Sequence, residues 1–194
     1  MRFKLRTGLM IVAGFAVLFA AIAAATHGHR KRLRITAELN AMGAYWVAFD
    51  DNNDLEKAAF DDRIRSNDIA RYKTLRYLDF TNSNVTDEDL QHLTDLPAIF
   101  YLELDGTSIS DAGLERLSRI KHLDVLELTG TRVTDAAVRD IAKITGLRGV
   151  VLTSTMVTSD GIDALKSLRP DVWVRHDTLG ILVEAEVPTK AADP

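Results

Sequence analysis

Residues 75–170 repeat one 24-residue pattern four times in succession, with no insertion between the copies. The copies span 75–98, 99–122, 123–146 and 147–170. Each copy has seven apolar positions, which in the first copy are Leu75, Leu78, Phe80, Val85, Leu90, Leu93 and Leu96. All 28 of these positions are apolar in a chain that is only 46% hydrophobic, so the period is not a chance event. A period of this length is typical of a solenoid, in which each copy buries its apolar face against its neighbours.

The spacing of the apolar residues changes from two to three within each copy. Leu102 and Leu104 flank Glu103, which predicts a short strand with its leucines inward and its glutamate outward. Leu114, Leu117 and Ile120 recur at every third position, which predicts a helix or a tight helical turn. We therefore expect an α/β solenoid of four full strand–helix coils with caps at both ends.

A hydroxyl residue stands just before each predicted helix, where its side chain can cap the free backbone N–H groups. An aspartate follows in three of the copies, and negative charge at a first helical turn is stabilised by the helix dipole. The fourth copy has Ser159 at that position, and its acidic residue is Asp160. The hydroxyl residues are Thr86, Ser110, Thr134 and Thr158, and the aspartates are Asp87, Asp111 and Asp135.

The pattern L-x-x-L-x-L-x-x-(S/T)-x-(V/I)-(T/S) resembles the leucine-rich repeat. The stretch 102–114, Leu-Glu-Leu-Asp-Gly-Thr-Ser-Ile-Ser-Asp-Ala-Gly-Leu, resembles a bacterial class of this repeat of the T-x-V-T-D-x-G-L type. In that class a hydroxyl residue replaces the usual asparagine after the strand, here Ser83, Thr107, Thr131 and Thr155. The start Arg-Phe-Lys-Leu-Arg-Thr with its apolar run also resembles small membrane-anchored proteins that carry the repeat. Both resemblances imply a binding scaffold and name no partner.

Charge is distributed unevenly along the chain. Residues 1–34 hold 7 of the 24 basic residues and none of the 28 acidic ones, which leaves 17 basic against 28 acidic residues, a net −11. Such a domain would repel nucleic acid, so we exclude it as a partner. Cysteine is absent, which excludes disulfides, thiolate metal sites and the cysteine-dependent ubiquitin ligases found among bacterial repeat effectors.

The segment Gly8–Thr26 contains 19 consecutive uncharged residues. As a helix it would span about 28 Å, close to the ~30 Å of a bilayer's hydrocarbon core. We therefore predict a single-pass membrane protein with residues 1–29 as basic flank and anchor, the repeat domain leaning toward the extracytoplasmic side. The alternative is a signal peptide cleaved near residues 21–25, but the apolar run is long and a basic cluster follows it.

The flanks of the repeats are predicted to close the open ends of the core. Residues 30–74 form the N-terminal cap: a helix from Arg30 to Met42 ending at Gly43, a strand from Tyr45 to Phe49, and half a repeat at 66–73. Residues 171–187 supply capping strands, and residues 188–194 are expected to be disordered.

The acidic stretch Asp50–Glu56 lies within that N-terminal cap. Its spacing imitates a calcium loop, yet Leu55 stands where such a loop needs glycine. We interpret the stretch as a solvated loop and predict no metal site.

The outward strand positions define the candidate binding surface, the concave face of the solenoid. The central column of this face is Asp79, Glu103, Glu127, Val151 and Arg175, with tyrosines beside its acidic part. Aromatic rings next to stacked carboxylates suit a lysine- or arginine-rich protein or peptide. The alternative interpretation is a merely solvated face. The predicted partner-binding residues are Tyr77, Asp79, Tyr101, Glu103, Asp105, Glu127 and Trp173.

Two carboxylates about 5 Å apart also imitate a retaining glycosidase pair, but a strand ladder offers no enclosed pocket. The five histidines form no nucleophile–base or metal-ligand pattern. We therefore predict a non-enzymatic interaction module without catalytic residues or cofactors. The alternative function is a self-associating structural protein of the cell envelope, joined through its C-terminal edge strand and the stripe Ala16, Ala20 and Ala24.

Overall fold

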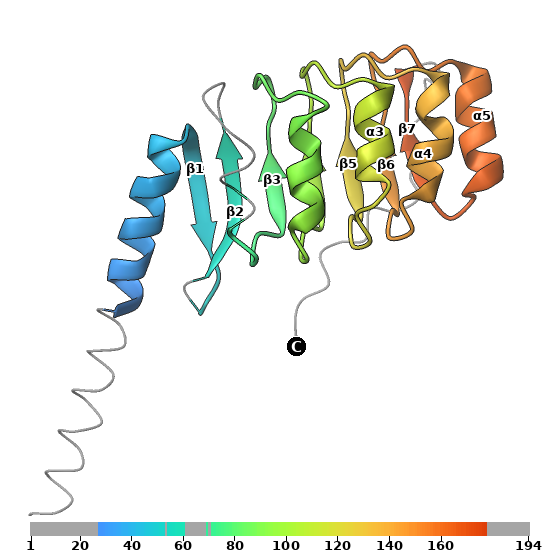
Figure 1. The fold of residues 1–194 in the computed structure, drawn as a ribbon. Helices are drawn as coiled ribbons and strands as arrows, with labels where there is room; N and C mark the ends of the chain where they lie inside the picture. The colour runs from blue at the N-terminus through green and yellow to red at the C-terminus, as the bar shows by residue number, and fades with distance from the viewer. Residues whose placement is uncertain (1–26, 53, 61–68, 70, 178–194) are drawn as a thin grey trace, which may run out of the picture.

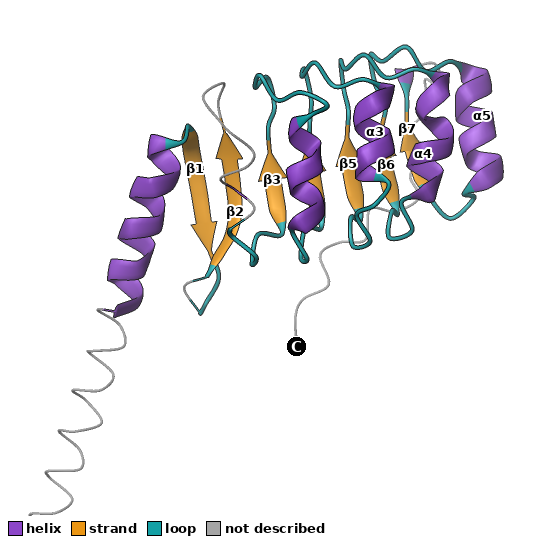
Figure 2. Ribbon diagram, viewed as in Figure 1, coloured by secondary structure: helices purple, strands orange, loops and turns teal. Residues whose placement is uncertain are grey.

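The computed structural model describes residues 27–52, 54–60, 69 and 71–177. These residues form one seven-stranded sheet in chain order with helices along one of its faces (Figure 1, Figure 2). The strands are β1 (Ala44–Phe49), β2 (Leu55–Phe60), β3 (Tyr77–Asp79), β4 (Tyr101–Glu103), β5 (Val125–Glu127), β6 (Gly149–Val151) and β7 (Trp173–Arg175). The helices are the segment 27–41, then η1 (Asp89–Asp95), α3 (Asp111–Leu117), η2 (Asp135–Ala137), α4 (Val138–Lys143) and α5 (Ser159–Leu168).

The strands β3 to β7 are parallel, and each is displaced from the previous one by one 24-residue period. Tyr77 pairs with Tyr101, and the same row continues through Val125, Gly149 and Trp173. The helical segments return the chain to the start of the next strand, as parallel pairing requires. The expected α/β solenoid of strand–helix coils and its strand register are thus confirmed.

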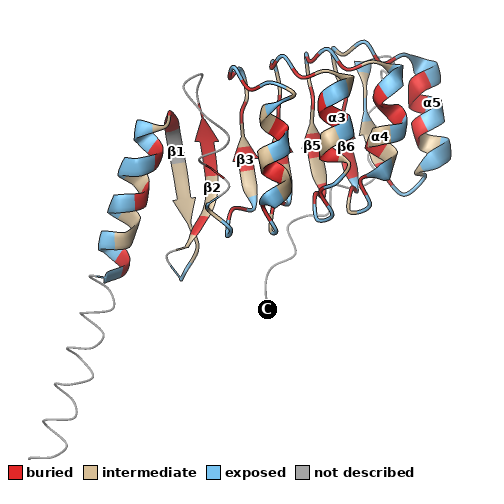
Figure 3. Ribbon diagram, in the orientation of Figure 1, coloured by how far each residue is buried: buried red, intermediate tan, exposed pale blue. Residues whose placement is uncertain are grey.

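The core lies between the sheet and the helices (Figure 3). Of the 28 apolar repeat positions, 27 are buried, and the exception is Leu168, which is 53% exposed. Leu168 ends α5, the last helix of the described chain, so no later helix covers it. Phe60 and Phe80 extend the core into the preceding coil, with ring centroids 5.6 Å apart.

The N-terminal cap begins with a helix over residues 27–41, in agreement with the helix predicted from Arg30 to Met42. Ile35 and Leu39 are buried against the core. Gly43 has a φ of 100°, the left-handed conformation that lets a glycine end a helix. The predicted strand after it is β1, which pairs antiparallel to β2.

Strand β2 was not predicted from the sequence, and its first two residues were assigned to a solvated loop. The predicted loop Asp50–Glu56 ends earlier than expected, because Leu55 and Glu56 already belong to the strand. Lys57 pairs with Tyr77, so Leu55, Ala58 and Phe60 take the inward positions of a coil that is four residues shorter than the others. Because of this shorter spacing, the coil does not follow the 24-residue pattern. Ile69, which belongs to the predicted half repeat at 66–73, is fully buried.

Four turns after successive strands share one left-handed residue. The residues at this position are Asn82, Gly106, Gly130 and Ser154, with φ between 53° and 69°. Glycine adopts this conformation without steric cost, which accounts for the two glycines. The predicted hydroxyl residue follows, and the hydroxyls of Thr107, Thr131 and Thr155 donate to the carbonyl three residues earlier, closing the turn.

The aspartates at the helix starts clamp neighbouring coils together. Asp111 accepts the backbone N–H of Thr134 at 2.8 Å and its hydroxyl at 2.7 Å. Asp87 does the same for Ser110, and Asp135 does so for Thr158.

The prediction that all four hydroxyl residues cap their helices is only partly right. Thr134 and Thr158 also accept from their own helices, as predicted, whereas Ser110 caps nothing. Thr86 donates to Asp89 and is not the cap residue of η1.

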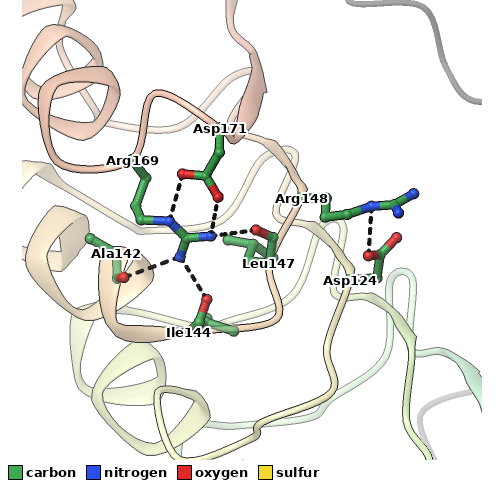
Figure 4. A network of polar contacts seen from close by, with 7 residues as sticks. All are labelled: Asp124, Ala142, Ile144, Leu147, Arg148, Arg169 and Asp171. Atoms are coloured by element: carbon green, nitrogen blue, oxygen red, sulfur yellow. Dashed lines mark hydrogen bonds and ion pairs between the residues drawn. The ribbon is translucent and has the colours of Figure 1, made fainter.

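Arg169 closes the last coil (Figure 4). Its guanidinium donates to the carbonyls of Ala142, Ile144 and Leu147, and it pairs with Asp171 at 2.8 and 2.9 Å. Free carbonyls at the end of α4 are thereby satisfied. Asp171 replaces an apolar residue of the repeat because it contacts Arg169 instead of another coil.

Several predictions fall outside the described residues: the anchor Gly8–Thr26, the part of the C-terminal capping strands from residue 178 to 187, and the tail 188–194. Within the part of the chain that the structure describes, no helix is long and apolar enough to cross a bilayer.

Candidate functional site

The outer face of the sheet is the concave side of the solenoid. Neighbouring strands lie about 4.8 Å apart, whereas packed helices lie about 8–10 Å apart, so the coil row bends toward the strands. The predicted central column stands on this face in register, with Asp79 beside Glu103, Glu103 beside Glu127, and then Val151 and Arg175. The seven residues predicted for partner binding all lie on this side of the sheet or in the turns that follow the strands.

Tyr77 and Tyr101 form the aromatic part of the surface. Their rings stack with centroids 4.8 Å apart and an angle of 17° between the planes. Each phenol reaches diagonally to the adjacent strand: Tyr77 donates its hydroxyl proton to Glu103, and Tyr101 donates its hydroxyl proton to Glu127. Tyr101 thus contacts the glutamate of the next coil and not Glu103 on its own strand.

These hydrogen bonds hold both glutamates in fixed positions. The sequence predicts that carboxylates stacked on adjacent strands repel one another. In the structure, each glutamate accepts a hydrogen bond from a neutral phenol, and the two stacked rings lie beside the central column. The acidic column and the tyrosines therefore form one connected network.

The electrostatics of this network favour neutral phenols. Burial raises the pKa of Tyr101 above its ordinary 10.0, and its hydrogen bond to Glu127 and the nearby carboxylates raise it further. The pKa of Tyr77 is raised by burial and by Glu103 in the same way. Burial is also the main reason that the pKa of Glu103 is raised, with Asp79, Glu127 and Asp105 adding to it and the Tyr77 hydrogen bond opposing it.

Two of the predicted acidic residues are engaged by backbone groups. Asp79 accepts the N–H of Thr81 at 2.8 Å, and Asp105 accepts the N–H of Thr129 on the next coil at 2.7 Å. These bonds stabilise the turns at the strand ends. Their carboxylates remain on the concave side, where they add negative potential to the face.

Trp173 lies apart from the two tyrosines. Its indole covers Gly149, where an added Cβ would stand 2.0 Å from the ring. The sequence places Trp173 in the same row as Tyr101, but Val125 and Gly149 separate them. The C-terminal part of the surface is therefore an apolar floor of Val125, Val151 and the indole, ending at Arg175.

One contributor to the surface was missed from the sequence. The ammonium group of Lys57 lies 5.7 Å from the centre of the Tyr77 ring, a cation–π contact at the start of the aromatic row. Lys57 was missed because it belongs to β2, the strand of the short coil. The pattern Leu55-x-x-Ala58-x-Phe60 is the signal that could have identified it.

The helical side offers an open groove of about 620 Å³ between η1 and α3. Its lining mixes both charges, with His92 and Asp95 from η1, Glu115 and Arg116 from α3, and Arg119 just after α3. In the described residues no group of three or more histidine, aspartate or glutamate side chains is arranged to hold a metal ion. Asp50 in the acidic turn accepts the N–H groups of Asn52 and Asp54, and Asp54 pairs with Lys31.

No family model and no curated protein matches the chain. Among solved structures, it is similar to the crystal structure of an internalin (inlF) from Listeria monocytogenes, at 19% identity and a TM-score of 0.39. That match covers 57% of this chain and 37% of the internalin. A second similarity, to the crystal structure of PEPR1-AtPEP1, has 13% identity and a TM-score of 0.32 and covers 69% of this chain and 26% of that one. This chain thus spans 37% of the first and 26% of the second of these longer proteins.

Proposed function

We propose that this chain is a non-enzymatic interaction module that binds a basic protein or peptide on the concave face of a short leucine-rich-repeat domain with four full coils. The observation that carries the proposal is the stacked pair Tyr77 and Tyr101, which holds Glu103 and Glu127 in a fixed row. Rigid aromatic rings beside ordered carboxylates bind cations at a low entropic cost. The cation–π contact of Lys57 with Tyr77 is an internal example of this chemistry.

The domain is further proposed to be tethered to a membrane by Gly8–Thr26, with the repeats on the extracytoplasmic side. The support is the uncharged run in the sequence and the basic residues on either side of it. N-terminal sequencing of the protein from the membrane fraction should find residues before Ala21 retained. Recovery of a chain that begins at Ala24 or Thr26 from a soluble fraction would instead establish a cleaved signal peptide.

The binding surface is tested by cross-linking and pull-down from native membranes, followed by capture of the identified partner. The double variant Tyr101→Ala with Glu103→Lys should abolish capture, because it removes the aromatic wall and reverses one charge. Its melting temperature should stay close to that of the wild type, since both side chains point away from the core. Capture by the wild type should also slow as salt rises.

The matched control reverses charges on the helical side. The double variant Glu115→Lys with Arg116→Glu changes two residues of α3 and should leave capture intact. If the control variant lost capture and the concave variant kept it, the binding surface would have to be assigned to the helices.

Self-association as a structural envelope protein is the second candidate. Strand β7 is the last strand of the described sheet, with β6 on only one side of it. An open strand edge can pair with another chain. Sedimentation of the full chain in detergent micelles at rising concentration distinguishes the two functions, because a monomer throughout would exclude self-association.

A further inference from the structure

The central column of the concave face changes its charge along its length. Glu103 and Glu127 stand side by side on β4 and β5, followed by Val151 on β6 and Arg175 on β7. One row of side chains thus runs from negative to positive across an apolar position. The following inference rests on the proposed function and specifies the partner that this row fits.

The negative end of the row has unused acceptor capacity. Glu103 and Glu127 each accept one phenol hydroxyl, and a carboxylate has about four acceptor positions. No salt bridge joins either glutamate to a lysine or arginine of the described chain. A basic side chain of a partner would therefore find two carboxylates on neighbouring strands, which lie about 4.8 Å apart.

The positive end is also unpaired. The side chain of Arg175 is exposed and forms no ion pair with any described residue. Asp177 on the same stretch accepts hydrogen bonds from the backbone and hydroxyl of Ser154 instead. A guanidinium presents donors in a fork that matches a carboxylate.

The floor between the two ends is apolar. Val151 is only 3% exposed, and the indole of Trp173 covers the neighbouring Gly149. Apart from the indole N–H of Trp173, this floor contributes no side-chain hydrogen-bonding group. The residues of a partner between its two charged side chains can therefore rest on it with that one N–H left to pair.

The separation of the two ends sets the spacing in the partner. Glu127 and Arg175 are two strand intervals apart, about 10 Å. In a polyproline II segment, residues three apart point the same way and lie about 9 Å apart. In a regular β-strand, side chains three residues apart point to opposite faces, so the two charges would not both reach the row.

We propose that the concave face binds an extended peptide segment with a lysine or arginine three residues from an aspartate or glutamate. The basic side chain lies on Glu103 and Glu127, and the carboxylate lies on Arg175. The partner is thus recognised by a pair of opposite charges at a fixed spacing, whereas a uniformly basic segment would bring a positive charge against Arg175.

The test is a selection from a displayed library of random peptides of about 12 residues on the immobilised full chain in detergent micelles. Selected peptides should be enriched in a basic and an acidic residue three positions apart. The variant Arg175→Glu should select a second basic residue in place of the acidic one. The variant Arg139→Glu, which changes an exposed arginine on the helical side, should select the same peptides as the wild type.

A selected peptide then provides a quantitative check. Replacing its acidic residue with glutamine should weaken binding to the wild type by about two- to fivefold, the size of one exposed ion pair. The same replacement should leave binding to Arg175→Glu unweakened.

Basic peptides without a spaced acidic residue would overturn the inference and leave the proposed function standing. Selection that is unchanged in the Tyr101→Ala with Glu103→Lys variant, or no enrichment at all, would overturn the proposed function as well.

Discussion

The carboxylates on the two sides of this molecule have opposite effects on the fold. On the helical side, Asp135 accepts two hydrogen bonds from Thr158, and these bonds lower its pKa. On the concave side, burial and neighbouring acidic residues raise the pKa of Glu103. A lowered pKa means that the folded state stabilises the charged carboxylate, and a raised pKa means that it does not. Ionised Asp135 therefore contributes to stability, whereas Glu103 is charged at the expense of stability.

The helical-side clamps also explain which residues the repeat allows nearby. A Cβ added at Gly113 would lie 2.5 Å from the Asp87 carboxylate, and one at Gly161 would lie 2.0 Å from that of Asp135. Alanine stands at the equivalent position of the third copy, Ala137, so glycine is not required beside every aspartate. The aspartate and its hydroxyl partner are thus part of the packing between coils, whereas nothing in the fold requires acidic residues at the outward strand positions.

The largest effect on stability should come from truncating a buried residue of a strand, compared with its outward-facing neighbour. Leu126→Ala on β5 should lower the free energy of unfolding by about 2–5 kcal/mol, because Leu126 is fully buried between the sheet and the helices. Glu127→Ala, one residue later on the outer face, should change it little. Chemical denaturation measures both, and a larger loss for Glu127→Ala would contradict the strand register.

Removal of a clamp should have the next largest effect. Asp111→Ala should cost about 1–3 kcal/mol, since it removes two charge-assisted hydrogen bonds and leaves the N–H of Thr134 without its acceptor. Glu103→Ala is the matched control on the concave face and should cost less. Equal losses from the two variants would show that the two classes of carboxylate do not differ as described.

The half-buried, hydrogen-bonded Tyr101 of the concave face should make the stability of the fold depend on pH in the alkaline range. The unfolded chain ionises its tyrosines near 10.0, whereas the folded state keeps Tyr101 protonated to a higher pH. Above pH 10.0 the folded state then binds more protons than the unfolded state, so the free energy of unfolding falls as pH rises. In Tyr101→Phe this fall should be less steep, as measured by denaturation at a series of pH values. An unchanged slope would show that Tyr101 ionises normally in the folded protein.

Acidic pH should give the smallest effect and should have opposite signs on the two sides. The stabilising contribution of Glu103 is present below its ordinary pKa of 4.5 and is lost as pH rises through the raised pKa of the folded state. The contribution of Asp135 is present above its ordinary 3.8 and is lost as pH falls through its lowered pKa.

Two conservative variants measure these contributions separately. Relative to wild type, Glu103→Gln should gain stability as pH rises above 4.5, and Asp135→Asn should lose less as pH falls below 3.8. Changes of the same sign in both variants would remove the distinction between the two sides.

The placement of the candidate site followed from periodicity, but its contacts did not. Alternation at two around Leu102 and Leu104 was enough to put Glu103 on the outer face, and the 24-residue period was enough to align it with Glu127. The diagonal bond from Tyr101 to Glu127 depends on the direction in which a long side chain leans. A pattern of residue types contains no information about that direction.

Sequence alone determined the coil from residue 75 onward, because inward apolar residues at a constant period can be buried in only one register. A one-residue slip would turn every one of them toward water. Only the tertiary structure decided the features that depend on contacts between coils: the aspartate clamps, the short coil that contains β2, the indole over Gly149, and the guanidinium of Arg169 on the last carbonyls. Each of these joins residues that are distant in sequence and whose own segments would fold locally in the same way without them.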